Sequence, residues 1–411
     1  MQTTLFPVTS SERIQALDFL RGVAILGILI MNIQSFAMPG AAYTNPTAFG
    51  DLNGINRWVW MLSHLLGDQK FMTIFSLLYG AGIVMIAERA KAKAARPASL
   101  HFRRTFWLLI IGLIHAHLIW YGDILVSYAL CALFVYFFRK LRPLTLLIIG
   151  VLFVSMHTLL YWFFGTSLEH WPVDALNLAK SSWQPTPEEI EAEINAVTGS
   201  LLEQIKYNSQ SALFLEILVF PVLFLWRAGG LMLVGMAMYK WGILSGLKSS
   251  RFYQLGLLCS WLLGFPIVIY GLVQNFETDW NFHYSMYLGS QYNYWGSLPI
   301  SFGYICITML IIRSKALPWI RIRLAAVGQM ALTNYLSQSI ICIIIFYGIG
   351  FGLFGRLDRV YQIGILVPIW LLQILWSKPW LDRYRFGPAE WMWRSLTYLK
   401  FQPFIKKQKV T

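Results

Sequence analysis

The sequence predicts an all-α protein, a polytopic transmembrane helix bundle of about 10 spans with both ends on the cytoplasmic side. Hydrophobic residues make up 57% of the 411 positions and charged residues only 13%, whereas soluble proteins average about 25% charged residues. The apolar residues gather in long runs, each close to the roughly 20 residues that cross a bilayer core. Basic residues lie in short clusters between these runs, which predicts orientation in a membrane and argues against nucleic-acid binding.

Ten apolar runs follow one another and indicate a single membrane domain over residues 1–411. The turn-forming sequence Tyr121-Gly122-Asp123 divides the third run from the fourth. The first run is too long for a signal-peptide core, so we expect it to be retained. The runs have approximate limits of 16–38, 69–88, 104–122, 123–139, 143–165, 216–240, 252–273, 294–312, 323–349 and 360–377.

The distribution of Lys and Arg sets the orientation, because cytoplasmic connections are enriched in both. With the cytoplasmic ends assigned inside, 26 of the 33 basic residues lie in inner segments, including the basic and aromatic tail 378–411. The outer connections and their margins hold only six, among them Lys70. Arg227 is left within a span. The predicted partner of the apolar surface of these spans is the lipid bilayer.

The longest outer segment, residues 166–215, is acidic and predicted to be helical outside the cytoplasm. Thr186 can cap a helix whose first turn is filled by acidic side chains. Two interpretations stay open: an amphipathic helix on the membrane surface, or a lid over a site that opens outward.

Ionisable groups within spans are the first functional candidates, because they are costly there. Asp18 and Arg21 share a helix face and can form an ion pair, and Asn32 continues that stripe about 16 Å deeper. The stripe serves either to pack helices or to bind an anionic ligand through Arg21, since arginine pairs well with carboxylate and phosphate.

The histidines His64 and His115 are candidate general bases, because imidazole titrates near neutral pH. Asp123 lies eight residues after His115 and could fix its tautomer. His117 points to a different side of the same helix, so a metal pair is not indicated. The alternative for each histidine is a hydrogen-bonded packing role. The four cysteines lie one per apolar stretch, which indicates neither a disulfide nor a zinc site.

Four further polar residues lie in spans. Arg227 stands near the centre of the sixth, with Glu216 on roughly the same face. Asn334 and Gln338, four residues apart in the ninth, make one polar face. Such a face either joins helices by hydrogen bonds or lines a pocket.

Several motifs make the chain resemble the bacterial YeiB-like family of membrane proteins, which carries a domain of unknown function. The resemblance covers nearly the whole chain and implies an inner-membrane protein without implying a reaction. The motifs are LDFLRGVAILGILIMNI, KFMTIFSLLYGAG, IGLIHAHLIWYGDILVSYAL, GQMALTNYLSQS and, in the tail, RFGPAEWMWRSLTY.

A more distant similarity concerns the first span. Arg13-x-x-x-Leu17-Asp18-x-x-Arg21-Gly22 is similar to the opening of transmembrane acyltransferases such as the heparan-glucosaminide acetyltransferases and the bacterial acyltransferase-3 proteins. That similarity implies transfer of an acyl group from a cytoplasmic donor such as acetyl-CoA to an outer acceptor. Asp18 and Arg21 match the motif, whereas neither His64 nor His115 lies in a matching segment.

The sequence leaves three functions open. The first is a membrane acyltransferase, with an acyl-CoA donor bound near Arg21 and with His115 or His64 as the base. The second is a transporter or channel for a small solute, lined by Arg227, Glu216 and the Asn334 to Gln338 face. The third is a non-catalytic membrane partner that docks through residues 378–411.

Overall fold

The computed structural model describes residues 15–93, 96–314 and 316–406, which are mainly helical and contain no strand. The predicted all-α helix bundle is confirmed. The longer helices are α1 (Gln15–Ala37), α3 (Gly54–Leu66), α4 (Lys70–Ala92), α5 (Pro97–Ile114), α6 (Leu125–Val135), α7 (Pro143–Ser167), α8 (Val173–Trp183), α9 (Pro187–Thr198), α10 (Leu201–Phe214), α11 (Leu225–Lys240), α12 (Ser250–Glu277), α13 (Ser290–Ser314), α14 (Pro318–Gln329), α15 (Ala331–Phe346), α16 (Arg359–Arg383) and α17 (Pro388–Tyr398).

Shorter elements join or extend these helices. They are α2 (Ala41–Thr44), the π-helices η2 (His115–Ile119), η5 (Leu215–Phe224) and η6 (Tyr284–Gly289), and the 3-10 turns η3 (Tyr136–Lys140) and η4 (Leu168–His170). In the described part of the chain, eight helices are long and apolar enough to cross a membrane, and nine if α14 and α15 count as one bent span. The chain is therefore a multi-pass membrane protein.

The difference from about ten spans lies in the fourth run, 123–139. Its helix α6 has 11 residues, about 17 Å, which is too short to cross a bilayer core of about 30 Å alone. The ninth run is also not one straight helix, because α14 and α15 meet at Met330 with a bend of 81°.

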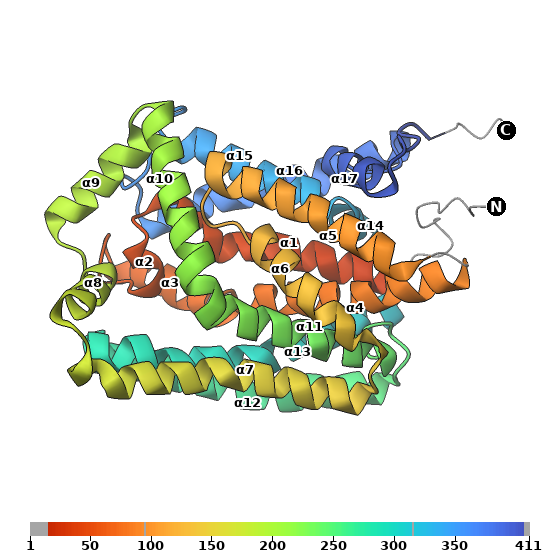
Figure 1. Ribbon diagram of the computed structural model, residues 1–411, viewed down its shortest axis with the longest axis horizontal. Helices are drawn as coiled ribbons and strands as arrows, with labels where there is room; N and C mark the ends of the chain where they lie inside the picture. Colours follow the sequence, from red (N-terminus) through yellow and green to blue (C-terminus); the bar gives the residue numbers. More distant parts are fainter. Residues whose placement is uncertain (1–14, 94–95, 315, 407–411) are drawn as a thin grey trace.

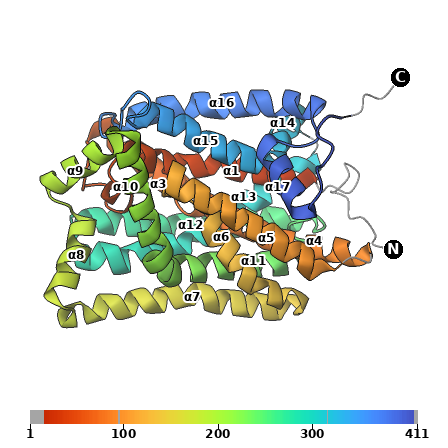
Figure 2. The ribbon, with the colours of Figure 1, turned by 45° about the horizontal axis from the view of Figure 1, so that its top comes forward.

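The spans run side by side along the long axis of the molecule (Figure 1). Helix α1 lies between α16 on one side and α7 on the other (Figure 2). Of the most apolar window of α1, 72% is buried inside the bundle, against 22% for the span containing α7. Helix α1 is therefore the central element, whereas α7 leaves most of its surface for lipid.

Glycines allow the central helices to touch backbone to backbone. A Cβ added to Gly22 of α1 would lie 1.9 Å from the carbonyl oxygen of Leu324 in α14, and one on Gly328 would lie 1.9 Å from that of Asp18. Helices α4 and α11 meet in the same way at Gly80 and Gly235. These contacts fix α4 and α11 beside each other and α14 beside α1.

Helices α8 and α9 lie at one end of the bundle and α17 at the other (Figure 1). We call these the outer and inner ends, following the predicted orientation. At the outer end, Thr186 and Glu189 form a capping box at the start of α9. Val197 of α9 is fully buried, and its carbonyl accepts a hydrogen bond of 3.2 Å from Gly348 N. The segment 166–215 is therefore helical and packs on the bundle rather than lying free of it.

At the inner end, α17 packs against the break between α14 and α15. Glu390 accepts hydrogen bonds from the backbone N–H groups of Leu332 and Thr333 at 2.6 and 3.1 Å, and from the Thr333 hydroxyl at 2.6 Å. These N–H groups belong to the first turn of α15, which has no earlier helical residue to bond to. The tail thus caps α15 with a buried carboxylate.

Candidate functional site

Helix α5 changes its winding at His115. Residues His115–Ile119 form a π-helix, and Trp120 then adopts an extended conformation before α6 begins at Leu125. Such π-helical turns are frequent at functional sites because they redirect side chains. The change of winding brings His115 and Asp123, eight residues apart, face to face.

The His115 imidazole bridges a carboxylate and a hydroxyl. Its Nδ1 lies 2.8 Å from Asp123 Oδ1, and its Nε2 lies 2.9 Å from Oγ of Ser339 in α15. The side chains of His115 and Asp123 are each 1% exposed, and Ser339 is also 1% exposed. We call these three residues the His115 triad.

The second oxygen of Asp123 holds the carboxylate in place, since it accepts a hydrogen bond of 2.7 Å from Val126 N at the start of α6. With Asp123 ionised, the proton between the two side chains lies on His115 Nδ1. His115 Nε2 then acts as the acceptor for the Ser339 hydroxyl. This is the arrangement in which a histidine can take a proton from a hydroxyl group.

Aromatic rings and a cavity surround the triad. The ring of Tyr335 lies 5.1 Å from that of His115, and its hydroxyl accepts a hydrogen bond from Ile124 N at 3.3 Å. A cavity of about 160 Å³ lies at the outer end between α10 and α15. Its lining includes Ile119, four residues after His115, and Ile340, next to Ser339. The cavity therefore adjoins the segments that carry His115 and Ser339, while its lining includes none of the three triad residues.

His117 faces away from the triad, as the two-residue spacing predicted. Its Nδ1 lies 2.9 Å from Ser209 Oγ of α10, and its Nε2 lies 3.5 Å from Glu216. Glu216 therefore pairs with His117 and not with Arg227.

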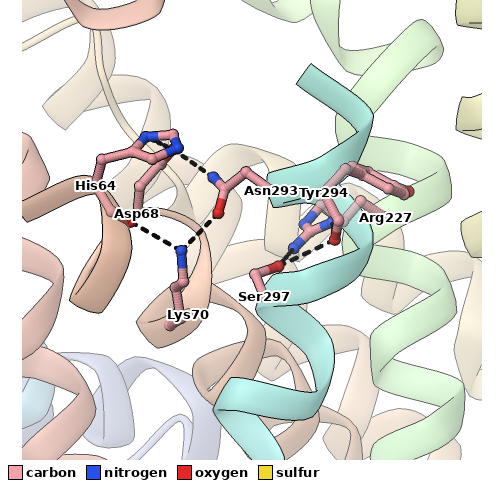
Figure 3. A network of polar contacts seen from close by, with 7 residues as sticks. All are labelled: His64, Asp68, Lys70, Arg227, Asn293, Tyr294 and Ser297. Atoms are coloured by element: carbon pink, nitrogen blue, oxygen red, sulfur yellow. Dashed lines mark hydrogen bonds and ion pairs between the residues drawn. The ribbon is translucent and has the colours of Figure 1, made fainter. Parts of the chain in front are cut away.

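A second polar network joins residues in or next to α3, α4, α11 and α13 (Figure 3). It comprises His64, Asp68, Lys70, Arg227, Asn293, Tyr294 and Ser297, and we call it the Lys70 cluster. Asp68 Oδ2 lies 3.2 Å from His64 Nδ1 and accepts a bond of 2.7 Å from Asn293 Nδ2. Lys70 Nζ donates to Asn293 Oδ1 at 2.5 Å and to the His64 carbonyl at 2.8 Å. Asn293 thus links the acid to the amine.

Arg227 joins this cluster from α11. Its guanidinium donates to the Tyr294 carbonyl at 3.1 Å and to the hydroxyls of Ser297 and Thr73 at 2.7 and 3.2 Å. Arg227 is 1% exposed and Lys70 is 0% exposed. Lys70, which charge counting assigned to an outer margin, therefore has its side chain buried in the bundle, between Asn293 of α13 and the His64 carbonyl of α3.

The polar stripe of α1 has the expected form. Arg21 Nη1 lies 2.9 Å from Asp18 Oδ1. Asp18, Arg21, Asn32 and Ser35 are all partly exposed, although most residues of α1 are buried. Ser35 Oγ lies 3.4 Å from the hydroxyl of Tyr121, which follows the π-helical turn. The stripe thus leads from the inner end of α1 to the segment between His115 and Asp123.

The polar face of the ninth run is used for helix packing. Asn334 Nδ2 donates to the Val327 carbonyl and to Ser377 Oγ, at 3.1 and 3.2 Å. Gln338 Nε2 donates to the Ile25 carbonyl and to Gln373 Oε1, at 3.2 and 2.9 Å. These bonds join α15 to α1 and α16.

Comparison with known proteins places these residues in a family. Residues 238–400 match a family model described as "Protein of unknown function (DUF418)". The chain is 31% identical over 403 residues to the uncharacterized protein YeiB of Escherichia coli (strain K12), an alignment that spans 96% of this chain and 99% of YeiB. It is 32% identical over 425 residues to the uncharacterized protein YxaH of Bacillus subtilis (strain 168), with 99% and 100% spanned. The chain belongs to the YeiB-like DUF418 family.

The two networks differ in how they relate to the DUF418 segment. Ser339 and Asn293 lie within residues 238–400, whereas His115, Asp123 and Lys70 come from the preceding part of the chain. Each network is therefore complete only when both parts of this YeiB-like protein fold together. The names of the relatives assign no reaction, so a function has to be argued from the geometry.

Sequence reasoning missed Ser339 and Lys70. Ser339 lies in the motif GQMALTNYLSQS, but no local pattern links it to His115, which is 224 residues away. A better signal was available for Lys70, because the second apolar run begins within two residues of Asp68 and Lys70. Charges so close to a span are candidates for burial.

Proposed function

We propose that this protein is an acyltransferase in the bacterial inner membrane. It would move an acyl group from a cytoplasmic acyl-CoA-type donor to an acceptor hydroxyl presented at the outer end. The observation that carries this proposal is the His115 triad, in which one imidazole is held between a carboxylate and a hydroxyl. The similarity of the Asp18 to Gly22 segment to transmembrane acyltransferases supports the same reaction class.

The chemistry assigned to His115 is proton transfer. His115 Nε2 takes the proton of the acceptor hydroxyl while the oxygen of that hydroxyl bonds to the acyl carbonyl carbon of the donor. When the carbon–sulfur bond of the thioester breaks, the imidazolium returns the proton to the departing thiolate. Asp123 stabilises the imidazolium between these steps. An ester forms, a thioester is consumed, and a free thiol is released.

Tyr335 is placed to stabilise the oxyanion that develops during this attack. It lies one helical turn before Ser339, on the same face of α15. Because its hydroxyl accepts from Ile124 N, its own hydrogen is available to donate. A donor aimed at the developing charge accelerates acyl transfer.

The inner end offers a site for the donor. Arg21 lies near Arg104 of α5, close enough for their charges to repel. Arg104 also lies over the ring of Trp393 of α17, 3.8 Å from its centroid. Phosphate groups such as those of coenzyme A bind arginine by charge and by hydrogen bonds. An anionic donor between Arg21 and Arg104 would relieve their repulsion.

The test uses the full chain purified in detergent with radiolabelled acetyl-CoA. We expect slow release of free coenzyme A by the wild type and a loss of at least about 100-fold in His115→Ala, the usual size of a general-base contribution. His117→Ala is the matched control, since it lies on the same π-helical turn but contacts Ser209 and Glu216. The absence of any binding or turnover of acyl-CoA by the wild type would refute the proposal.

A second candidate function is transport of a small solute, favoured by the buried charges of the Lys70 cluster, since such charges mark substrate paths in membranes. Asn334 and Gln338 would not line that path, because their amides are engaged in helix packing. Uptake into proteoliposomes that is lost in Arg227→Gln and kept in His115→Ala would favour the transporter.

A further inference from the structure

The Lys70 cluster contains more basic than acidic side chains. Lys70 and Arg227 are the basic groups, and Asp68 is the acid whose charge acts on both. Among the described residues, neither basic group lies within ion-pair distance of a carboxylate; the ion-pair partner of Asp68 is His64. Burying an unpaired charge in the membrane interior is costly. When Lys70 and Arg227 are both protonated, the cluster therefore lacks one negative charge.

Two buried side chains in or beside the cluster also have nitrogens that lack hydrogen-bond partners. The Nε of Arg227 is buried with no partner. His157 of α7 is 2% exposed, and both of its ring nitrogens lack partners. Both side chains lie against Tyr294: the His157 ring stacks on it at 4.1 Å, and the Arg227 guanidinium lies 4.3 Å from its centroid. Unpaired buried donors are rare and call for an explanation.

We propose that the Lys70 cluster binds one small monovalent anion, contacted by Arg227 and His157 and balanced in charge by Lys70. A single ligand of this class supplies both missing quantities, one negative charge and the acceptors for buried N–H groups. The net charge of the cluster sets the valence, because Lys70 and Arg227 exceed Asp68 by one. This inference is independent of acyl transfer at the His115 triad.

The structure indicates how an anion reaches the cluster from the outer end. The side chains of His64 and Asp68 keep exposures of 15% and 12%, so the cluster is least buried on this side. Trp60 stacks on His64 at 5.0 Å and packs edge-on against Trp280 at 5.2 Å. Trp280 in turn lines a pocket of about 510 Å³ whose lining also includes Lys180 and Asp279. Lys180 offers an entering anion one positive charge at the mouth of this route.

The experiment titrates anions into the full chain, purified in detergent and a HEPES buffer of constant ionic strength. Sodium chloride and sodium acetate are the probes, and the thermal midpoint Tm is followed by tryptophan fluorescence. Ligands that bind only the folded state raise Tm in a saturable way. We expect a saturable rise for the wild type with at least one probe.

Two variants test where the anion binds. Lys70→Met removes the excess charge, so its Tm should exceed that of the wild type without added anion and should no longer respond to it. Lys240→Met is the matched control, since this lysine lies at the inner end of α11 and donates to the carbonyls of Arg139 and Leu141. It should keep the wild-type response.

The proposal is overturned by a wild-type Tm that does not respond to either anion, or by an unchanged saturable response in Lys70→Met. If Lys70→Met does not fold, calorimetric titration of acetate and chloride into wild type and Arg227→Gln replaces it. Equal heats in these two proteins would reject the site, whereas loss of binding in Arg227→Gln would support it.

Discussion

His115 Nε2 and Ser339 Oγ share a hydrogen bond of 2.9 Å although 224 residues separate them. The bond joins the π-helical turn after α5 to the middle of α15, and Asp123 completes the arrangement from the start of α6. Three elements thus converge on one imidazole. A site of this kind is sensitive to small changes in any of them.

Asp123→Asn should abolish most acyl transfer while leaving the fold intact. The amide can still accept from Val126 N, but its NH2 group would present a donor to His115 Nδ1 and favour the wrong tautomer. We expect a fall in turnover of about 100-fold or more. Turnover of acetyl-CoA and Tm are measured together, and Ser209→Ala, which affects only His117, serves as control. A variant with full activity would contradict the assigned role.

Glu390→Ala should destabilise the protein by about 2–4 kcal/mol, because two backbone N–H groups and a hydroxyl lose their acceptor. Glu390→Gln is the control, since its carbonyl oxygen can accept from Leu332 and Thr333. Burial raises the pKa of Glu390 above its usual range. Equal Tm values for the two variants at pH 7 would contradict the capping role.

The raised pKa of Glu390 also gives a pH dependence with a defined sign. A carboxyl group whose pKa is raised by folding adds most stability below its unfolded pKa and loses it as the pH rises through the folded value. As the pH is raised from 4.5, the Tm of the wild type should therefore fall relative to the Tm of Glu390→Gln. A difference that is constant with pH would show that Glu390 does not titrate in this range.

Glu193 should anchor the outer helix α9. Its Oε1 accepts from Gly40 N at 2.9 Å and from the Tyr207 hydroxyl at 2.6 Å. Burial raises its pKa, so the docked state is most stable at acidic pH and weakens as the pH rises. After correction for intrinsic rates, amide exchange of α9 should be slower at pH 5 than at pH 7.5. Glu193→Gln should remove this difference, and Glu193→Ala should speed exchange at both values.

Gly22→Ala should prevent normal folding, because the new methyl group would meet the Leu324 carbonyl oxygen at 1.9 Å. Helices α1 and α14 would have to separate, and such overpacking costs several kcal/mol when backbone atoms obstruct. Gly82→Ala is the control, as nothing lies within 4 Å of its added Cβ. The measure is the yield of monodisperse protein after detergent extraction, which should fall only for the first variant.

The sequence predicted the helical membrane fold because composition and run length follow from the bilayer itself. It paired His115 with Asp123 because a spacing of eight residues is local. It could not find Ser339, since a contact between η2 and α15 depends on the arrangement of the whole bundle. Nothing in a serine within an apolar run distinguishes a catalytic partner from a packing residue.

Lys70 shows a second limit. Gly67-Asp68-Gln69-Lys70 has the composition of a polar turn, and charge counting placed it at the outer margin. The structure puts the turn inside the bundle because α3 precedes it directly and because Asn293, 223 residues away, accepts from the amine. A buried charge becomes recognisable only when its distant partners are known. Arg227 was correctly noted as a charge inside a span, but its neighbours were not foreseeable.

The cap that Glu390 forms on α15 has a mechanical consequence. Seven residues of continuous helix separate Leu332, whose N–H is held by Glu390, from Ser339, a rigid rod of about 10 Å. A force that pulls α17 away from the inner end therefore acts along the axis of α15 on Ser339, whose hydroxyl contacts His115. Tail and triad are thus joined through one helix, and in the acyltransferase that we propose a ligand bound to the tail would act on the site of the reaction.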